Sequence, residues 1–469
     1  MTETAEPSTL AAARPARPAR PARRGPTELP FSFVDHALVD RISAGNAEPA
    51  WLREDRLAAL AAFDALPVES NRLYTPYVDL RAAALDGAVP YTAVASGGGA
   101  AAPDEAIAGL LDLREEGVAA RSLDEATARA GVRLLTLGEL VTTDEALARS
   151  LIEGAPLLPA EEKLAELSRA TWTTGAVIHV PAGVRVERPI VVRWSLGAPR
   201  TLVGRTFIVL EDGAEATVVE ELVAGDAAQP GAQGMLCATT EIRLGAGARL
   251  AMTSLQELGP DHVVFQQRHA LIGEGADLRW ALAQLGGRLV RSRVDNVLAG
   301  DRSTVEQTEI VFGAADQLHD LTSYTRHVGR DTTGQLLSKG VLFDRARTYM
   351  KGLIQIEKTA IGTDSYLGEF GMNLSRAARA VAIPSLEIDQ PDCRRAAHSS
   401  SVGPVDESQL FYLESRGIAP DDARKFIVLG FLEPVVARVP LEEAQDRLRD
   451  ALEAKWASGV ASTGSATAA

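Results

Sequence analysis

Cysteine is the scarcest chemistry-bearing residue in this sequence. Only Cys237 and Cys393 occur in 469 residues, and they form no CxxC pair. So few thiols are typical of a reducing compartment and give no disulfide framework. Two cysteines also cannot complete a Cys-ligated zinc site or iron–sulfur cluster, so any metal site needs histidines, carboxylates or a second subunit.

Positive charge and long apolar runs are lacking too. The chain has 48 Lys and Arg against 63 Asp and Glu, and its formal net charge of −15 argues against a nucleic-acid partner. No stretch of about 18 residues is apolar and free of charge, which argues against a membrane partner. No Walker-A loop is present, so any ATP hydrolysis belongs to another protein. These features favour a soluble, cytoplasmic protein.

Both ends of the chain are poor in core-forming residues. Residues 1–29 are dominated by Ala, Pro and Arg and are predicted to be a disordered tail. An Arg-rich start also resembles an organelle transit peptide, but the repeated prolines oppose the amphipathic helix that such peptides need. Residues 459–469, rich in Gly, Ser and Ala, are predicted to be a second disordered tail.

Residues 30–172 carry mainly helical patterns. Stretches such as PAWLREDRLAALAAFDALP place apolar residues three and four positions apart, with Gly, Pro and Asn at their ends. A Gly- and Ala-rich stretch near 95–105 is predicted to be a flexible connector. The sequence therefore predicts an N-terminal, mainly helical domain.

The pattern changes to strands at Gly175 and keeps that character to about residue 400. Similar turns recur at Gly213, Gly247, Gly275, Asp301 and Asp331, about thirty residues apart, and such a period is typical of a solenoid. Because strands flank each turn with no helix between, we predict a parallel β-helix core over residues 173–400. A β-sandwich with coincidentally similar turns is the alternative.

Residues 401–458 return to helical patterns. Asp406 and Gln409 make a capping-box pattern, Gly417 suits a helix C-terminus, and Pro420 suits the first turn of a second helix. A third helix is predicted in PLEEAQDRLRDALEAKW. We therefore predict a C-terminal helical domain after the β-helix.

The stretch AAHSSSV, which contains His398, raises the question of an enzyme. A serine hydrolase would need one of the following serines beside a base, but no G-x-S-x-G turn is present. A β-helix polysaccharide lyase would need charged clusters and aromatic platforms, yet aromatic residues are 5% and no Asp/Arg/Lys cluster stands out at one recurring coil position. The other histidines form no HxH or HExxH pair and are interpreted as mostly structural; they are His36, His179, His262, His269, His319 and His327.

Three motifs in order, over roughly residues 160–440, resemble the SufB/SufD family of iron–sulfur cluster assembly proteins. They are GAVIHVPAGV followed by RPIVV, the late stretch KGLIQIEKTAIGTD with PSLEI, and the exit stretch HSSSVGPVDESQLFYLESRGI. LPVESNRLYTPYVDL looks like the N-terminal element of the SufD branch. The resemblance implies a right-handed parallel β-helix between helical domains.

The implied activity is that of a non-catalytic scaffold. Family membership implies pairing with SufB through the β-helix, binding of the ATPase SufC through the C-terminal helices, and a transient iron or iron–sulfur cluster shared with SufB, with none expected on this chain alone. A SufB-like paralogue and a homodimeric scaffold are the near alternatives.

The resemblance also assigns residues. His398 matches the family's interface histidine and becomes the candidate iron or cluster ligand. Many SufD proteins have a cysteine two residues earlier, where this chain has Ala396, so Cys393 is a substitute candidate. The residues that match the family pattern in the helical domain, and that are implied in SufC binding, are Leu410, Phe411, Tyr412, Arg416, Gly417, Phe426, Gly430 and Phe431.

Overall fold

The protein is described by a computed structural model that covers residues 31–80, 83–85, 87–94, 98–102, 104–153, 162–226, 229–439 and 442–466. The predicted tail over residues 1–29 and parts of the predicted connector near 95–105 lie outside the described residues.

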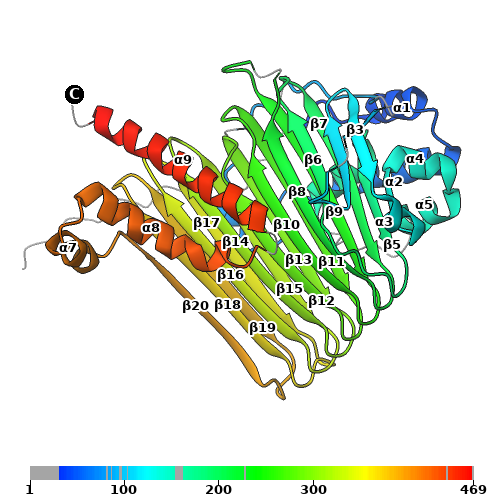
Figure 1. Cartoon of the computed structure of the whole chain (residues 1–469). Coiled ribbons are helices and arrows are strands. Elements are labelled where there is room, and N and C mark those ends of the chain that lie inside the picture. The colour runs from blue at the N-terminus through cyan, green and yellow to red at the C-terminus, as the bar shows by residue number, and fades with distance from the viewer. Residues whose placement is uncertain are drawn as a thin grey trace, which may run out of the picture.

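The core is a parallel β-solenoid. From β5 onward the strands alternate between an 11-stranded and a 9-stranded sheet, so each coil adds one strand to each sheet and β5 to β20 make eight coils (Figure 1). This confirms the predicted fold class and excludes the sandwich. The strands are β5 (Ala176–Val180), β6 (Ile190–Leu196), β7 (Thr201–Leu210), β8 (Glu215–Ala224), β9 (Gly234–Leu244), β10 (Arg249–Glu257), β11 (His262–Ile272), β12 (Asp277–Gln284), β13 (Leu289–Leu298), β14 (Thr304–Gly313), β15 (Leu318–His327), β16 (Thr333–Leu342), β17 (Arg347–Ile356), β18 (Asp364–Asn373), β19 (Arg379–Ile388) and β20 (Arg395–Gly403).

The recurring turns lie at one corner of the coils and have a common backbone conformation. Gly213, Gly247 and Gly275 have φ of 69°, 66° and 63°, in the left-handed region that glycine adopts without steric cost. In the next two coils Arg302 and Asp331 adopt the same region, with φ of 58° and 55°. The turn near Asp301 thus has its left-handed residue one position later than the sequence pattern indicates.

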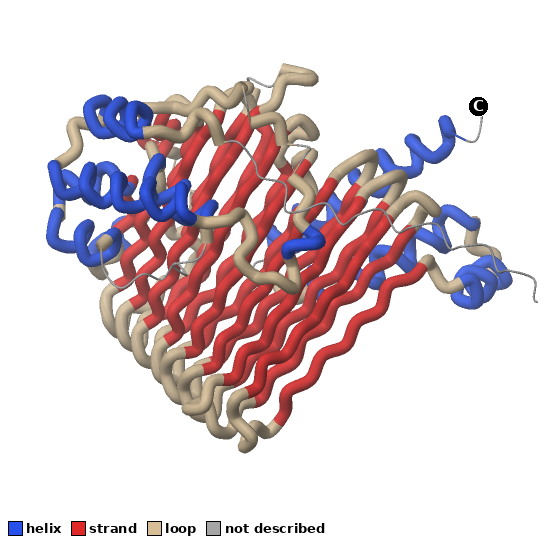
Figure 2. The backbone as a smooth tube through the Cα atoms, turned by 180° about the vertical axis from the view of Figure 1, so that it is seen from behind, coloured by secondary structure: helices blue, strands red, loops and turns tan. Residues whose placement is uncertain are grey.

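Both faces of the sheets are buried over most of the solenoid. Ile178, Ile208 and other alternate residues fill the interior between the sheets. The outer face of the 9-stranded sheet packs against N-terminal helices through residues such as Phe207 and Leu164, and part of the 11-stranded sheet packs against C-terminal helices through Phe312 and Leu432. Figure 2 shows the N-terminal helices over one end of the sheets. Burial on both faces is usual for parallel sheets, although many of the buried strand residues here are polar.

The N-terminal region contains strands as well as helices. β2 and β3 pair antiparallel and extend the 11-stranded sheet, while β4 pairs antiparallel with β5 at the end of the other sheet. The helical patterns in the sequence did not indicate these strands. A further short strand, β1, lies within the predicted connector and pairs with β3. The elements are α1 (His36–Gly45), α2 (Ala50–Ala65), the 3₁₀ helix η1 (Thr75–Tyr77), β1 (Gly99–Ala100), β2 (Gly109–Arg114), β3 (Gly117–Leu123), α3 (Glu125–Arg129), β4 (Arg133–Thr136), α4 (Leu137–Thr143), α5 (Glu145–Ile152) and α6 (Lys163–Thr171).

Three helices follow the solenoid: α7 (Glu407–Ser415), α8 (Pro420–Val436) and α9 (Glu442–Ala466). Asp406 caps α7 by accepting a hydrogen bond from the Ser408 N–H at 2.8 Å, and Gly417 follows with φ of 87°, as expected for the two ends of this helix. The solenoid continues to Gly403 rather than 400, and α9 continues into the segment predicted to be disordered. Among the described residues, no helix has both the length and the apolar composition needed to cross a bilayer.

Candidate functional site

The two ends of the solenoid differ in what covers them. At the first coil, called the covered end, β5 pairs with β4 and β6 pairs with β2. At the last coil, called the open end, β19 pairs with β17 and β20 pairs with β18, and within the described part of the chain no strand pairs with the other edge of either. Ile388 and Val402 in this coil are 44% and 39% exposed. An uncovered edge with apolar side chains is a template for pairing with another chain.

His398 lies in β20, within the open end, and not in an exit loop. It pairs in register with Leu367, which is fully buried in the solenoid interior. Since paired positions of neighbouring strands point to the same side of a sheet, the His398 side chain is on the inner face of the last coil. The imidazole is exposed, because no further coil covers it. An exposed imidazole at an uncovered edge can bind a metal together with ligands from a second chain.

Two of the three serines that follow His398 point away from it. Ser399 and Ser401 alternate with His398 along the strand and therefore point to the opposite face. The Ser399 Oγ is 2.5 Å from the Tyr366 hydroxyl on the neighbouring strand. The structure thus uses Ser399 in a contact on the outer face of β18 and β20.

Neither cysteine completes a site with His398 within this chain. Cys393 lies between β19 and β20, is half-buried, and packs with Leu386 and Ala396 against an interior apolar cluster. Cys237 is fully buried on β9, where burial raises the pKa of its thiol to about 12. Cys237 is therefore a packing residue. A thiolate-rich site at His398 requires cysteines from another subunit.

The remaining histidines do not form a metal cage. His269, His319 and His327 are buried, and burial lowers their pKa values to about 4, 3 and 4. The His179 Nε2 lies 2.9 Å from the Glu211 carboxylate. Among the described residues, no group of three or more His, Cys, Asp and Glu side chains is placed to hold a metal ion.

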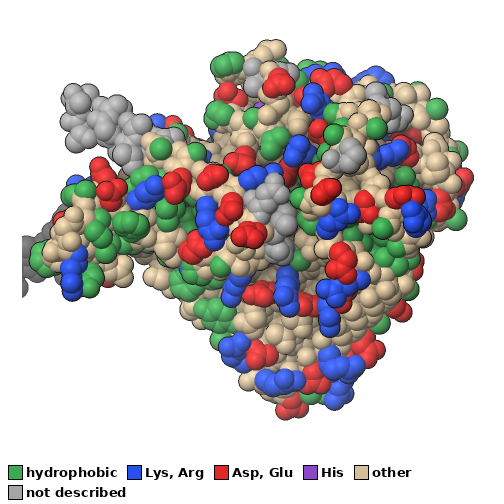
Figure 3. Space-filling model, viewed as in Figure 1, with side chains coloured by type: hydrophobic (Ala, Val, Ile, Leu, Met, Phe, Trp, Pro, Cys, Tyr) green, Lys and Arg blue, Asp and Glu red, His purple; other side chains and the backbone are tan. Residues whose placement is uncertain are grey.

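The C-terminal helices expose a cluster of aromatic residues. Phe411 and Tyr412 on α7 and Phe426 on α8 are 74%, 56% and 62% exposed. The α7–α8 lobe, made of α7 and the start of α8, extends beyond the edge of the solenoid in Figure 1, whereas the rest of α8 packs on the 11-stranded sheet through residues such as Leu432. Apolar side chains appear on the surface of this lobe in Figure 3. Exposed aromatic side chains gathered on one lobe are typical of a protein-binding surface.

The other predicted partner-binding residues are placed less uniformly. Phe431 is half-buried and packs on the solenoid, with the Lys339 ammonium 4.5 Å from its ring centroid and donating to its backbone oxygen at 2.6 Å. Arg416 is exposed, with its guanidinium 5.2 Å from the Tyr412 ring centroid. Leu410 is half-buried, while Gly417 and Gly430 are exposed. Phe431 therefore has a structural role in joining α8 to β16.

A charged groove lies on the outer face of the 11-stranded sheet. It corrects the sequence-based statement that no charged cluster occurs at one recurring coil position. Register brings Glu215, Arg249 and Asp277 side by side in successive coils, which is a charged cluster at one recurring coil position. Arg249 and Glu215 form an ion pair at 3.1 Å, and Arg279 pairs with Asp277 at 2.9 Å. The residues lining the groove include no aromatic sugar platform. The charges are paired along the sheet and leave no free acid–base pair.

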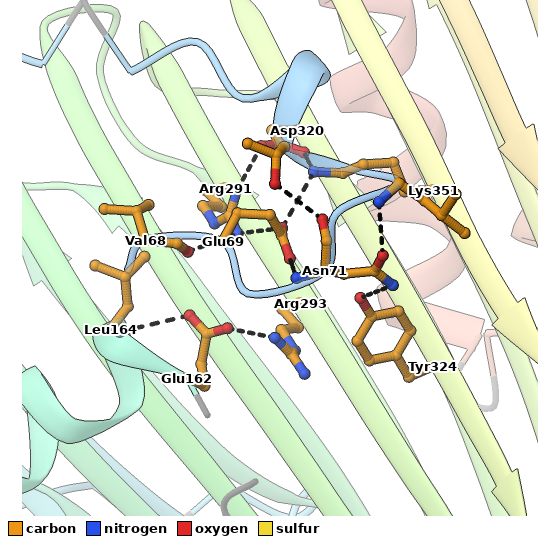
Figure 4. A network of polar contacts seen from close by, with 12 residues as sticks. Val68, Glu69, Asn71, Glu162, Leu164, Arg291, Arg293, Asp320, Tyr324 and Lys351 are labelled. Atoms are coloured by element: carbon orange, nitrogen blue, oxygen red, sulfur yellow. Dashed lines mark hydrogen bonds and ion pairs between the residues drawn. The ribbon is translucent and has the colours of Figure 1, made fainter. Parts of the chain in front are cut away.

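The sequence did not reveal a buried ionic network on the outer face of the 9-stranded sheet. Arg291 on β13 bridges Glu69 at 2.9 Å and Asp320 at 2.7 Å, and Lys351 on β17 contacts Asp320 at 2.5 Å; all four side chains are at most 2% exposed. Two acids face two bases, so the charges balance. Figure 4 shows this network beneath the segment that carries Glu69 and Asn71.

The same segment continues across the sheet toward the open end. The Tyr74 hydroxyl donates to the Gly352 carbonyl at 2.8 Å, and its ring stacks on Tyr324 at a centroid distance of 5.9 Å. Asn71 also donates to the Tyr324 hydroxyl at 3.2 Å. The paired charges, together with the hydrogen bonds of Tyr74 and Asn71, make this network a structural attachment of the N-terminal segment.

Glu369, which lies close to the open end, is another residue that the sequence did not identify as a site candidate. Its side chain is 1% exposed on the inner face of β18, and its carboxylate accepts one hydrogen bond, from the Ile383 N–H at 2.8 Å. Burial raises the pKa of Glu369 to about 8, and the hydrogen bond opposes this only in part. A single glutamate in a strand of mixed residues carries no sequence signal for such an environment.

Comparison with known proteins gives consistent matches. The family model described as the SufBD core domain of the SUF system for iron–sulfur cluster assembly matches residues 194–431, from within β6 to within α8. The iron–sulfur cluster assembly protein SufD of Bacillus subtilis is 30% identical over 297 residues, which are 63% of this chain and 67% of the relative. SufBD family proteins of Staphylococcus saprophyticus and Staphylococcus epidermidis are 26% and 25% identical, over 62% and 73% of each chain.

Proposed function

We propose, from the premise that the chain belongs to the SufBD family of iron–sulfur cluster assembly proteins, that it is the SufD-like scaffold subunit of a SUF complex. In this proposal it pairs with SufB through the open end and binds the ATPase SufC through α7 and α8. ATP hydrolysis belongs to SufC, and the chain itself is not an enzyme. A nascent cluster or iron is cargo at the junction with SufB.

The observation that carries the proposal is the open end itself. As far as the structure describes the chain, the solenoid stops with two unpartnered strand edges, half-exposed apolar residues and His398 on the last strand. A soluble protein usually blocks such edges. A second solenoid that continues the two sheets would pair the free backbone groups and bring its own ligands beside His398.

The proposed metal role of this site fits the donor set. His398 offers one exposed imidazole, while Cys237 is buried and Cys393 is half-buried against apolar residues. Imidazole is a known substitute for thiolate in iron–sulfur chemistry. The thiolates would come mainly from SufB, which agrees with the two cysteines of this chain.

The test distinguishes the proposed SufB-binding surface at the open end from the proposed SufC-binding surface on α7 and α8. The full chain is co-expressed with SufB-like and SufC-like proteins, and the complexes are purified and weighed by native mass spectrometry. Ile388→Lys with Val402→Lys should lose the SufB-like subunit, because a charge replaces apolar contacts at the edge. Phe411→Ala with Phe426→Ala should lose the SufC-like subunit and leave folding unchanged, because both rings are exposed. Val89→Lys, at a residue 52% exposed on the N-terminal part, is the matched control.

Retention of both partners by both double variants would contradict the proposal. A complex that contains two copies of this chain and no SufB-like subunit would instead favour the homodimeric scaffold. His398→Ala should keep the complex and lose cluster maturation on a target apoprotein. Normal maturation by this variant would remove the ligand role of His398.

A further inference from the structure

The inner face of the open end holds a second ligand-type side chain besides His398. Register pairs His398 with Leu367 and Ser400 with Glu369, so His398 and Glu369 lie on the same inner face of neighbouring strands, two positions apart. The strand spacing and rise per residue place their Cα atoms roughly 8 Å apart. Two long side chains at that spacing can reach a common point.

The opposite sheet brings the two side chains toward the same peptide. A Cβ added at Gly352 would lie 2.4 Å from the Leu367 side chain, so Leu367 faces Gly352 across the interior. In the next coil, His398 is the register partner of Leu367, and Pro384 is the register partner of Gly352. His398 therefore faces Pro384 across the interior, as Leu367 faces Gly352. The Glu369 carboxylate crosses the interior to the N–H of Ile383, the adjacent residue. Both ligand groups therefore approach the Ile383–Pro384 peptide of β19.

Glu369 lacks the counter-charge that most other buried carboxylates among the described residues have. Glu69 is paired with Arg291, and Glu241 is paired with Arg205 at 2.7 Å. Within the described residues Glu369 has no ion pair, although it is 1% exposed. Burying a carboxyl group without a cation costs free energy that an uncharged residue of the same shape would avoid. A cation at the uncovered end would supply the missing partner.

We propose that Glu369 is a second ligand of this chain for ferrous iron, which binds at the open end between the Glu369 carboxylate and the His398 imidazole. The inference rests on the proposed function, because the remaining ligands would come from the paired subunit. One carboxylate and one imidazole suit a divalent first-row metal such as Fe²⁺. Glu369 lies on β18, in the coil before the last one, and His398 lies on β20, in the last coil.

The experiment uses the complex of the full chain with its SufB-like and SufC-like partners, without oxygen and without sulfide. Fe²⁺ alone is titrated by calorimetry, and Co²⁺ is titrated in parallel by visible absorption as a probe of coordination. Glu369→Gln keeps the shape and the neutral state of the side chain while removing the anionic ligand. Glu387→Gln, which changes an exposed carboxylate in the last coil, is the matched control.

We expect Glu369→Gln and His398→Ala each to weaken Fe²⁺ binding at least tenfold and to change the Co²⁺ spectrum, while Glu387→Gln behaves like the wild type. Binding by Glu369→Gln equal to wild type, with His398→Ala defective, would overturn this inference and leave the proposed function standing. Equal binding by all variants, or no Fe²⁺ binding by the wild-type complex, would overturn both metal assignments. Thermal unfolding of Glu369→Gln at the same pH checks that lost binding does not reflect lost folding.

Discussion

The covered end and the open end of the solenoid are built from the same kind of coil but finish differently. At the covered end Ile178 and Val180 are fully buried, because β4 and β2 continue the two sheets past the first coil. At the open end β20 contains no buried residue, and most of β19 is only half-buried. A repeat protein needs a cap at each end to stay soluble. Here one cap is part of the chain, and in the proposed complex the partner would supply the other.

The largest effect is expected where the N-terminal segment is attached to the sheet. Arg291→Ala leaves the buried acids Glu69 and Asp320 short of one positive charge, so the free energy of unfolding should fall by about 3–5 kcal/mol. Chemical denaturation followed by circular dichroism measures this. Arg345→Ala, which removes an ion pair to Asp316 whose side chains are 67% and 66% exposed, should leave the free energy of unfolding almost unchanged, because solvent screens this pair. Equal losses would show that the buried network is not structural.

A matched isoleucine pair tests the comparison between the ends directly. Ile178→Ala removes a fully buried side chain at the covered end and should lower the free energy of unfolding by about 2–5 kcal/mol. Ile388→Ala, at a residue 44% exposed, should lower it by less than about 1 kcal/mol and weaken association with the partner instead. A large folding defect from Ile388→Ala would mean that the open end is closed in the free chain.

A third and more gradual effect is a pH dependence near the open end, which accumulates with each pH unit. The pKa of Glu369 is raised from 4.5 to about 8 in the folded protein. Between these values the unfolded chain loses a proton that the folded chain keeps, so the free energy of unfolding falls as pH rises, by about 1 kcal/mol per pH unit. Glu369→Gln should not show this contribution and should be the more stable protein at pH 8. Denaturation of the metal-free chain at pH 5 to 8 measures it; parallel curves for the two proteins would contradict the assignment.

The solenoid was predictable because its signal repeats. The turns at Gly213, Gly247 and Gly275 need a left-handed backbone that favours glycine, and each coil restates this requirement. The strands β2, β3 and β4 were not predictable from local pattern. They are four to seven residues long and form because an existing sheet edge offers them hydrogen bonds. Local propensity has little influence on such segments.

The candidate site was predictable only in part. His398 followed from a motif, but its place on a strand facing the interior depends on its register with Leu367. Glu69 and Arg291 are 222 residues apart, and no local pattern joins them. Glu369 becomes unusual only because β19 and β18 enclose it. Contacts made by folding, and not residue type, define these three environments.

The short connection between β20 and α7 has a mechanical consequence. β20 ends at Gly403 and α7 begins at Glu407, so a pull on α7 along the strand axis is transmitted to the edge strand with little slack. The parallel ladder between β20 and β18 runs from Arg395 to Gly403 and meets such a pull in shear, with its hydrogen bonds strained together. A pull across the strand would instead open them one at a time. The direction in which the α7–α8 lobe is moved therefore decides whether the last coil shifts as a rigid rod or peels from its neighbour.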